Sequence, residues 1–284
     1  MRAQLDPIFI QYLLQIGNGE GLTDKNCEIL LPSTFIIPYS DEITSINSLI
    51  TNVFPNFDLF HSNFESITNR AILTIRNEFV NDINDIIMSR FPGETKTYIS
   101  SNKAFEDRQQ ADYEDFFQNF NPPSLPPHLL TLKKNCPIML LRNLNPAEGL
   151  CNGTRLICLN FCDYVIHAKI TIRNFIGKEV FIPRIPLQCS NDDTCAIPFK
   201  RLQFPIRPCF ALTINKAQEQ ILDFVGLYLK EPVFSHGQLY VALSRAKTSQ
   251  DIKVLIKPSQ NQEENFNKTR NIVYKEVLIT AGII

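Results

Sequence analysis

Two clusters of polar residues between positions 209 and 246 are the part of this 284-residue chain best suited to do chemistry. The first cluster, Asn215-Lys216-Ala217-Gln218, directly follows an apolar run at 210–214. That run has the length of a buried strand, so the polar residues should stand where the chain leaves a sheet. The second cluster lies beyond another apolar run, at 224–229.

The second cluster predicts a helix that carries an arginine. Ser235 is a good N-cap residue, and at 3.6 residues per turn Gln238, Ala242 and Arg245 share one face. An arginine held in this way can bind a phosphate through two parallel hydrogen bonds. For Arg245 taken alone, an ordinary surface arginine is the alternative interpretation.

Taken together, the two clusters resemble the last two motifs of superfamily-one DNA helicases. The segments TINKAQ at 213–218 and QLYVALSR at 238–245 are closest to the Pif-one-like helicases, including those of Helitron transposons. The resemblance implies that the first motif couples single-stranded DNA to ATP and that Arg245 acts as an arginine finger on the γ-phosphate. The residues to which these roles fall are Thr213, Asn215, Lys216 and Gln218 in the first motif, and Gln238, Tyr240 and Arg245 in the second.

Weaker likenesses extend the resemblance toward the N-terminus. Met1-Arg2-Ala3 resembles the family's N-x-R-x element, which implies that Arg2 also touches the γ-phosphate. Thr74 and Arg76 resemble the family's L-x-T-R pattern, with Ile75 inserted between them, which implies a contact with nucleic acid. A solvated arginine at a helix start is the alternative for Arg76. Residues 133–156 also resemble the family closely.

The phosphate cradle of an ATP-driven motor is absent from these 284 residues. Among ten glycines only Gly177 precedes a lysine, and no G-x-x-x-x-G-K-[ST] segment occurs. The resemblance therefore covers the C-terminal half of a helicase. It implies ATP and Mg²⁺ as cofactors, but neither is expected to bind well to this chain alone. We expect a truncated ATP-dependent 5′-to-3′ DNA helicase that is inactive without a first RecA-like lobe.

Two further functions stay open at this point. The chain could be a non-enzymatic module that binds single-stranded DNA, or a transposon-derived remnant. The charge distribution suits the first of these, because residues 1–121 hold 8 basic and 17 acidic residues whereas residues 196–257 hold 9 basic and 4 acidic. Phosphate contacts are therefore expected in the second half of the chain.

The fold predicted for these motifs is α/β, a RecA-like second lobe with a parallel sheet. A strand at 70–75, a helix from 76 to 91 and a strand at 96–100 follow the parallel α/β pattern. From 155 to 204 only short β-rich runs occur, and the resemblance implies a small β-barrel of the Src-homology-three type there. The expected domains are a helical remnant of the first lobe and linker at 1–60, the second lobe at 61–152 and 205–257, the barrel at 153–204, and a tail at 258–284.

Three aromatic residues in the barrel region, Phe181, Phe199 and Phe204, are expected to be core residues, with stacking on bases as the alternative. Eight cysteines occur without a C-x-x-C pair. Cys158, Cys162, Cys189 and Cys195 could supply four thiolates, but we expect no zinc site because no histidine spacing supports one.

Composition indicates a globular chain, with 44% hydrophobic and 20% charged residues. No apolar run reaches the ~18 residues that span a bilayer, so no membrane partner is expected. The expected location is intracellular, and the family resemblance implies the nucleus.

Overall fold

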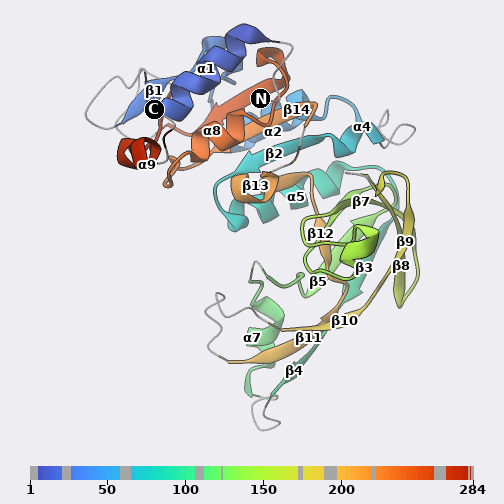
Figure 1. Ribbon diagram of the computed structural model, residues 1–284. Helices are drawn as coiled ribbons and strands as arrows, with labels where there is room; N and C mark the ends of the chain where they lie inside the picture. The colour runs from blue at the N-terminus through green and yellow to red at the C-terminus, as the bar shows by residue number, and fades with distance from the viewer. Residues whose placement is uncertain are drawn as a thin grey trace. The chain divides into compact units, whose positions relative to one another are not determined.

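The computed structural model describes residues 6–20, 27–57, 65–105, 112–122, 124–171, 175–188, 197–218, 220, 222–258, 267–280 and 282 (Figure 1). The chain divides into two compact units. Unit 1 comprises Met1–Asn56, Asn69–Ile83 and Ala211–Ile284, and unit 2 comprises Phe57–Thr68 and Asn84–Phe210. None of the helices in the described ranges combines the length and the apolar character that a membrane crossing requires.

Unit 1 is built on a four-stranded parallel sheet in the order β13-β2-β14-β15. The strands are β13 (Ala211–Thr213), β2 (Arg70–Thr74), β14 (Phe224–Leu229) and β15 (Ile252–Ile256). All three pairings are parallel. Strands this apolar are typical of a sheet buried on both faces. The parallel sheet expected from the sequence is confirmed.

The helices of unit 1 pack against this sheet and against one another. Helix α2 (Glu42–Val53) lies on β2, β14 and β15. Its contact requires a glycine in β14, because a Cβ at Gly226 would stand 2.6 Å from Cγ2 of Val53. Asp41 caps α2 by accepting a hydrogen bond from the Thr44 N–H at 2.9 Å. The remaining helices are α1 (Pro7–Asn18), the first part of α5 (Asn77–Arg90), α8 (Gln238–Leu243), α9 (Lys275–Thr280) and the 3-10 turns η1 (Ser33–Phe35), η4 (Ile214–Ala217) and η5 (Ser249–Asp251).

Segments from the first and the last parts of the chain meet within unit 1. Strand β1 (Glu28–Leu30) pairs antiparallel with β16 (Lys268–Arg270). Asp6 caps α1 through the Phe9 N–H at 3.0 Å and also accepts from the backbone and hydroxyl of Ser249. Figure 1 shows α1 alongside α8, and Tyr240 of α8 packs where a side chain at Gly17 would stand.

Unit 2 consists mainly of antiparallel strands. A five-stranded sheet has the order β12-β6-β7-β8-β9, a three-stranded sheet has the order β10-β11-β4, and β3 pairs with β5. The strands are β3 (Thr95–Ile99), β4 (Ser101–Ala104), β5 (Leu129–Lys133), β6 (Pro137–Leu140), β7 (Arg155–Phe161), β8 (Val165–Ile170), β9 (Glu179–Pro183), β10 (Ile185–Gln188), β11 (Phe199–Gln203) and β12 (Ile206–Pro208). The helical pieces are α4 (Glu65–Thr68), α7 (Glu114–Asn119) and η2 (Pro146–Glu148).

The expectation that the strand at 96–100 continues the parallel sheet is wrong. This stretch is β3, and it pairs antiparallel with β5. Its partner β5 lies beyond β4 and α7 in the chain, so the pairing is a long-range antiparallel one rather than the parallel pairing of a βαβ crossover. The antiparallel region consequently begins well before residue 153. The domain boundaries expected from the sequence stay predictions.

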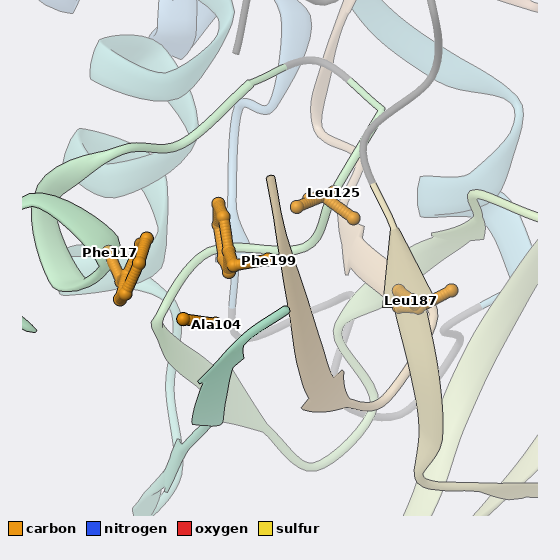
Figure 2. Close-up of a cluster of buried hydrophobic side chains, with 5 residues drawn as sticks. All are labelled: Ala104, Phe117, Leu125, Leu187 and Phe199. Carbon is orange, nitrogen blue, oxygen red and sulfur yellow. The ribbon is translucent and has the colours of Figure 1, made fainter. Parts of the chain in front are cut away.

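A small apolar cluster holds α7 against the three-stranded sheet (Figure 2). Its five buried residues are Ala104, Phe117, Leu125, Leu187 and Phe199. Beside the cluster lies Arg201, which is fully buried and donates to Asn102 and Asn121 Oδ1 and to the carbonyls of Phe117, Phe120 and Pro126. One guanidinium thus joins strand β4, helix α7 and the segment that leads to β5.

Of the three aromatic residues expected in the core, two are there. Phe199 and Phe204 are buried, whereas Phe181 on β9 is 65% exposed and stacks on the His167 ring at 4.8 Å. For Phe181 the expectation is wrong, because it alternates along β9 with the buried Val180 and Ile182 and so lies on the opposite face.

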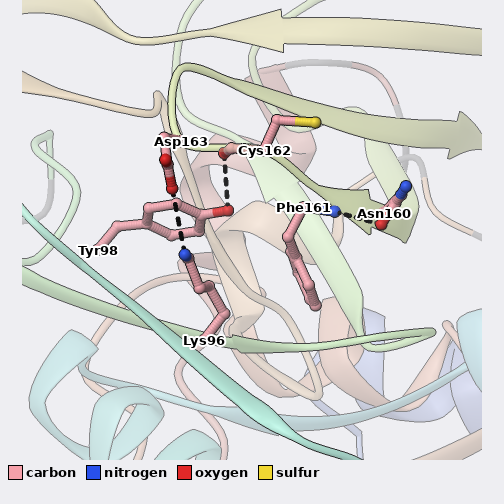
Figure 3. A network of polar contacts seen from close by, with 6 residues as sticks. All are labelled: Lys96, Tyr98, Asn160, Phe161, Cys162 and Asp163. Atoms are coloured by element: carbon pink, nitrogen blue, oxygen red, sulfur yellow. Dashed lines mark hydrogen bonds and ion pairs between the residues drawn. The ribbon is translucent and has the colours of Figure 1, made fainter.

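Polar contacts tie β3 to the turn between β7 and β8 (Figure 3). The Tyr98 hydroxyl donates to the Cys162 carbonyl at 3.0 Å, and Lys96 pairs with Asp163 at 3.2 Å. The pairing of β7 with β8 shifts register between Cys158 and Asn160. The contacts from β3 therefore stabilise the β7–β8 hairpin, whose hydrogen-bond ladder is interrupted by this shift.

Candidate nucleic-acid interface

The register of the parallel sheet places the expected DNA contacts at one edge. Thr213 of β13 stands beside Thr74 of β2, and Thr74 stands beside Tyr228 of β14. The carboxyl ends of these strands are therefore level. Arg76 follows β2 by two residues, and Asn215-Lys216 lies in η4 immediately after β13. In open α/β sheets, ligands bind outside this carboxyl edge.

The exposed and buried members of this set differ in what they can contact. Asn215 and Gln218 are exposed, and Lys216 is half-buried. Thr213 is 8% exposed and Thr74 is fully buried. The Thr74 hydroxyl finds no hydrogen-bond partner within the described residues. A ligand at this edge can thus reach η4 and Arg76. The predicted DNA contacts of Thr74 and Thr213 stay predictions.

Arg76 is the most accessible cation of the set, with 53% of its side chain exposed. Its guanidinium pairs with Glu231 at 2.8 Å and stands 4.0 Å from Glu78. Glu231 follows β14 by two residues, so this ion pair joins the ends of two neighbouring strands. A phosphate that approaches Arg76 must compete with a carboxylate, which exposed pairs permit at low cost.

The helix that carries the second motif is shorter than expected. Helix α8 spans Gln238–Leu243, and its N-cap is Gly237 in the left-handed conformation at φ 67°. The expectation that Ser235 caps the helix is wrong, because the Ser235 carbonyl instead accepts a hydrogen bond from the Gln238 N–H. Glycine adopts this conformation without steric cost, so the chain turns into α8 without a side-chain cap.

Arg245 lies just beyond the end of α8, and its side chain is directed toward the first motif. It is 9% exposed. Its guanidinium donates to the Val241 carbonyl at 2.9 Å, to the Ser244 hydroxyl at 2.8 Å and to the Ala217 carbonyl at 3.5 Å. Because Ala217 follows Lys216 in η4, the two motifs that are separated in sequence meet in space.

Gln238 begins α8 and is buried. Its side-chain carbonyl accepts from the Phe234 N–H at 3.1 Å, which fixes the loop that enters the helix. Within the described residues, Gln238 and Arg245 bond to protein atoms and form no cradle that would hold a triphosphate on their own. The predicted roles of both residues toward a nucleotide stay predictions.

The C-terminal residues position α8. The Gly237 N–H donates to the Ile272 carbonyl at 2.9 Å, and the Tyr274 N–H donates to His236 Nδ1 at 3.0 Å. The His236 and Tyr274 rings stack at 5.4 Å. No motif in the sequence indicated that residues after 258 would support this helix.

Sequence reasoning also missed an anionic residue at the carboxyl edge. Glu42 starts α2, and its carboxylate receives Lys230 Nζ at 2.6 Å, Lys257 Nζ at 2.7 Å and the Tyr228 hydroxyl at 3.3 Å. The two lysines lower the pKa of Glu42 to about 2, with the Lys230 hydrogen bond the largest cause. The sequence carries no signal for this cluster, because Glu42 and its nearest partner in the chain are separated by 186 positions.

Some of the predicted residues lie outside the described ranges, namely Arg2 and two of the four possible thiolates, Cys189 and Cys195. Among the residues that the structure describes, no three of His, Cys, Asp or Glu gather as metal ligands do. Cys136 and Cys158 are buried free thiols, and burial raises the pKa of Cys136 to about 12.

Comparison with known proteins agrees with this architecture. The family model of the DNA helicase Pif1 2B domain matches residues 115–161. ATP-dependent DNA helicase PIF6 of Trypanosoma brucei brucei is 30% identical over 127 residues, which are 44% of this chain and 16% of the relative. ATP-dependent DNA helicase PIF1 of Homo sapiens is 33% identical over 129 residues, 45% of this chain and 19% of the relative. The resemblance to Pif1-like helicases is thereby confirmed.

Solved Pif1 structures share the fold over nearly the whole chain. Pif1 helicase from Candida albicans superposes with a TM-score of 0.59 at 18% identity and covers 99% of this chain and 59% of that one. Pif1 helicase from Bacteroides, in a complex with ADP-AlF3 and single-stranded DNA, gives a TM-score of 0.58 at 20% identity, covering 99% and 54%. The chain thus corresponds to little more than half of these Pif1 structures, and the matched segment is less than a fifth of the two curated relatives.

Proposed function

We propose that this chain is the C-terminal part of a Pif1-like, ATP-dependent 5′-to-3′ DNA helicase and that it binds single-stranded DNA along the carboxyl edge of its parallel sheet. The observation that carries the proposal is the meeting of the two motifs, with Arg245 donating to Ala217 beside Lys216. An exposed polar turn after β13 and an exposed arginine after β2 provide contacts suited to a phosphate backbone.

The nucleotide roles in this proposal depend on a first RecA-like lobe. That lobe would supply the cradle for ATP and Mg²⁺ that is missing from these 284 residues. Arg245 would then act as the arginine finger on the γ-phosphate, and Arg2 would be a second contact to that phosphate. Gln238 and Gln218 would contribute to nucleotide binding. An arginine finger is worth ~10³–10⁵ in rate in related phosphoryl-transfer enzymes.

The antiparallel region adds a second part to the proposal. The five-stranded sheet of unit 2 is proposed to be the small barrel of the Src-homology-three type that grips the strand. The exposed Phe181 ring supports this, because an exposed aromatic face can stack on a base. The nucleus is the location that the family resemblance favours for this activity.

Binding of a fluorescent single-stranded oligonucleotide at several salt concentrations tests the proposal. We expect salt-dependent binding by the whole chain, with Lys216→Gln weakening it and reducing the slope of log K against log salt by about 0.7 for the loss of one phosphate contact. Lys253→Gln is the matched control, since Lys253 lies near the start of β15, away from the carboxyl edge, and bonds to the Thr34 carbonyl. Absence of binding at low salt, on the order of 20 mM, would refute the proposed function.

A further inference from the structure

Each strand of the parallel sheet is followed by a cation at its carboxyl end. In the register of the sheet, Thr74 stands beside Tyr228, and Tyr228 stands beside Leu255. Arg76, Lys230 and Lys257 each follow one of these three residues by two positions. Lys216 stands three residues beyond the end of β13. With strands about 4.8 Å apart, the four positions span roughly 14 Å across the sheet. The sequence motifs account for Lys216 and Arg76, but not for the two other lysines.

Lys230 and Lys257, the two lysines outside the motifs, both pair with one carboxylate. Lys230, Lys257 and the Tyr228 hydroxyl all donate to the single carboxylate of Glu42, at 2.6, 2.7 and 3.3 Å. The two lysine side chains are 29% and 34% exposed and that of Glu42 is 35% exposed, so solvent and ligands reach the group. Three donors that converge on one carboxylate provide the geometry that also suits a phosphate.

Acidic residues of the chain itself lie beside these cations. Glu42 pairs with two of them, Glu231 pairs with Arg76, Glu78 stands 4.0 Å from Arg76, and Asp41 precedes Glu42 in the chain. Asp41 is committed to capping α2. Among these four acids of the described edge, Glu42 is the one that holds two lysines at once. Its removal would therefore uncover more positive charge than the removal of any other acid in this set.

We propose that Lys230, Lys257 and the Tyr228 hydroxyl form a further phosphate site for single-stranded DNA, and that Glu42 occupies this site until DNA displaces it. The proposal rests on the proposed function and extends the DNA path from β13 and β2 to the ends of β14 and β15. Glu42 acts as an internal competitor, because a phosphate and its carboxylate need the same donors. The Lys257 N–H donates to the Leu229 carbonyl at 3.0 Å, which keeps the site aligned with the sheet.

Oligonucleotide binding by Glu42→Gln tests the competition. We expect binding several-fold tighter than that of the unchanged chain, with a salt slope steeper by about 0.7 for one additional phosphate at the protein surface. The increase in affinity should vanish when Lys230→Gln and Lys257→Gln are added. Glu28→Gln is the control for net charge, since Glu28 pairs with Lys268 at 3.4 Å on the β1–β16 ribbon.

The outcomes separate this proposal from the proposed function. If the unchanged chain binds DNA and Glu42→Gln binds no more tightly than Glu28→Gln, the competition is refuted while the proposed function stands. If neither the unchanged chain nor Glu42→Gln binds, both proposals fail. Circular dichroism establishes that each variant is folded. If Glu42→Gln does not fold, the double variant that combines Lys230→Gln with Lys257→Gln provides the test. This variant should bind the oligonucleotide on the order of tenfold more weakly than the unchanged chain. Unchanged binding would refute the site.

Discussion

At the scale of single residues, the carboxyl edge is organised by ion pairs that cross between elements. Glu42 joins the start of α2 to the ends of β14 and β15, and Glu231 joins the end of β14 to that of β2. Exposed pairs of this kind contribute little to stability on their own. Glu42 differs because one carboxylate pairs with two lysines, which lower its pKa to about 2.

This arrangement predicts a pH dependence of stability. The folded-state pKa of Glu42 is about 2, below its ordinary value of 4.5. A depressed pKa contributes stability that is present above the unfolded pKa and is lost as the pH falls from about 4.5 to about 2. The partners that face the carboxylate are Lys230, Lys257 and Tyr228, and the same contact raises the pKa of Lys257.

Urea unfolding of the unchanged chain and of Glu42→Gln between pH 7 and pH 2 measures this contribution. At pH 7 the unchanged chain should be more stable by about 1 kcal/mol, a value discounted for solvent screening. The difference should shrink as the pH falls below about 4.5 and vanish near pH 2. A difference independent of pH would show that the carboxylate charge is not the cause.

At the scale of elements, a buried arginine holds together a part of unit 2 whose apolar core is small. Arg201 bonds to five acceptors in β4, α7 and the segment before β5, and the apolar cluster beside it has five buried residues. These five acceptors are amide and backbone oxygens, so none of them is ionised. Removing the guanidinium leaves several buried carbonyls without this donor.

Arg201→Met should therefore lower the free energy of unfolding by roughly 3 kcal/mol. Chemical denaturation followed by far-UV circular dichroism measures this change, since the chain has no Trp to serve as a fluorescent probe. Lys200→Met is the matched control on the same strand. Lys200 is exposed, and its replacement should change stability by no more than about 0.5 kcal/mol. Equal losses for both variants would contradict this role for Arg201.

At the scale of the whole molecule, the two motifs that resemble those of a helicase lie together in a chain without a nucleotide cradle. The second motif is packed against the first, and the C-terminal residues support it through Gly237 and His236. In the proposed function, ATP hydrolysis requires a phosphate cradle from a first lobe, and these 284 residues contain no such segment.

The purified chain should accordingly show no Mg²⁺-dependent ATP hydrolysis above background, with or without single-stranded DNA. Phosphate release in a coupled assay measures this. Contaminating enzymes are the usual source of false turnover, so the Arg245→Lys variant is purified in parallel. Turnover that is present in the unchanged chain and absent from Arg245→Lys would overturn the prediction of inactivity.

Much of the fold could be predicted because the relevant signals are local. The strands at 70–74, 211–213 and 224–229 are apolar runs of strand length, and each was predicted to within a residue or two. The short β runs between 155 and 204 were also apparent. The resemblance of two segments to helicase motifs implied that the residues around Lys216 and Arg245 serve one site. Local pattern and spacing are properties of neighbouring residues, which a sequence displays directly.

The tertiary structure decided which distant residues meet. The antiparallel pairing of β3 with β5, the start of α8 at Gly237 and the exposure of Phe181 depend on partners that no local pattern names. The pairing of Glu42 with Lys230 and Lys257 joins residues separated by about two thirds of the chain or more. Such contacts depend on strand order and register, which are set when the sheet buries its apolar faces, and no one stretch of a single sequence encodes them.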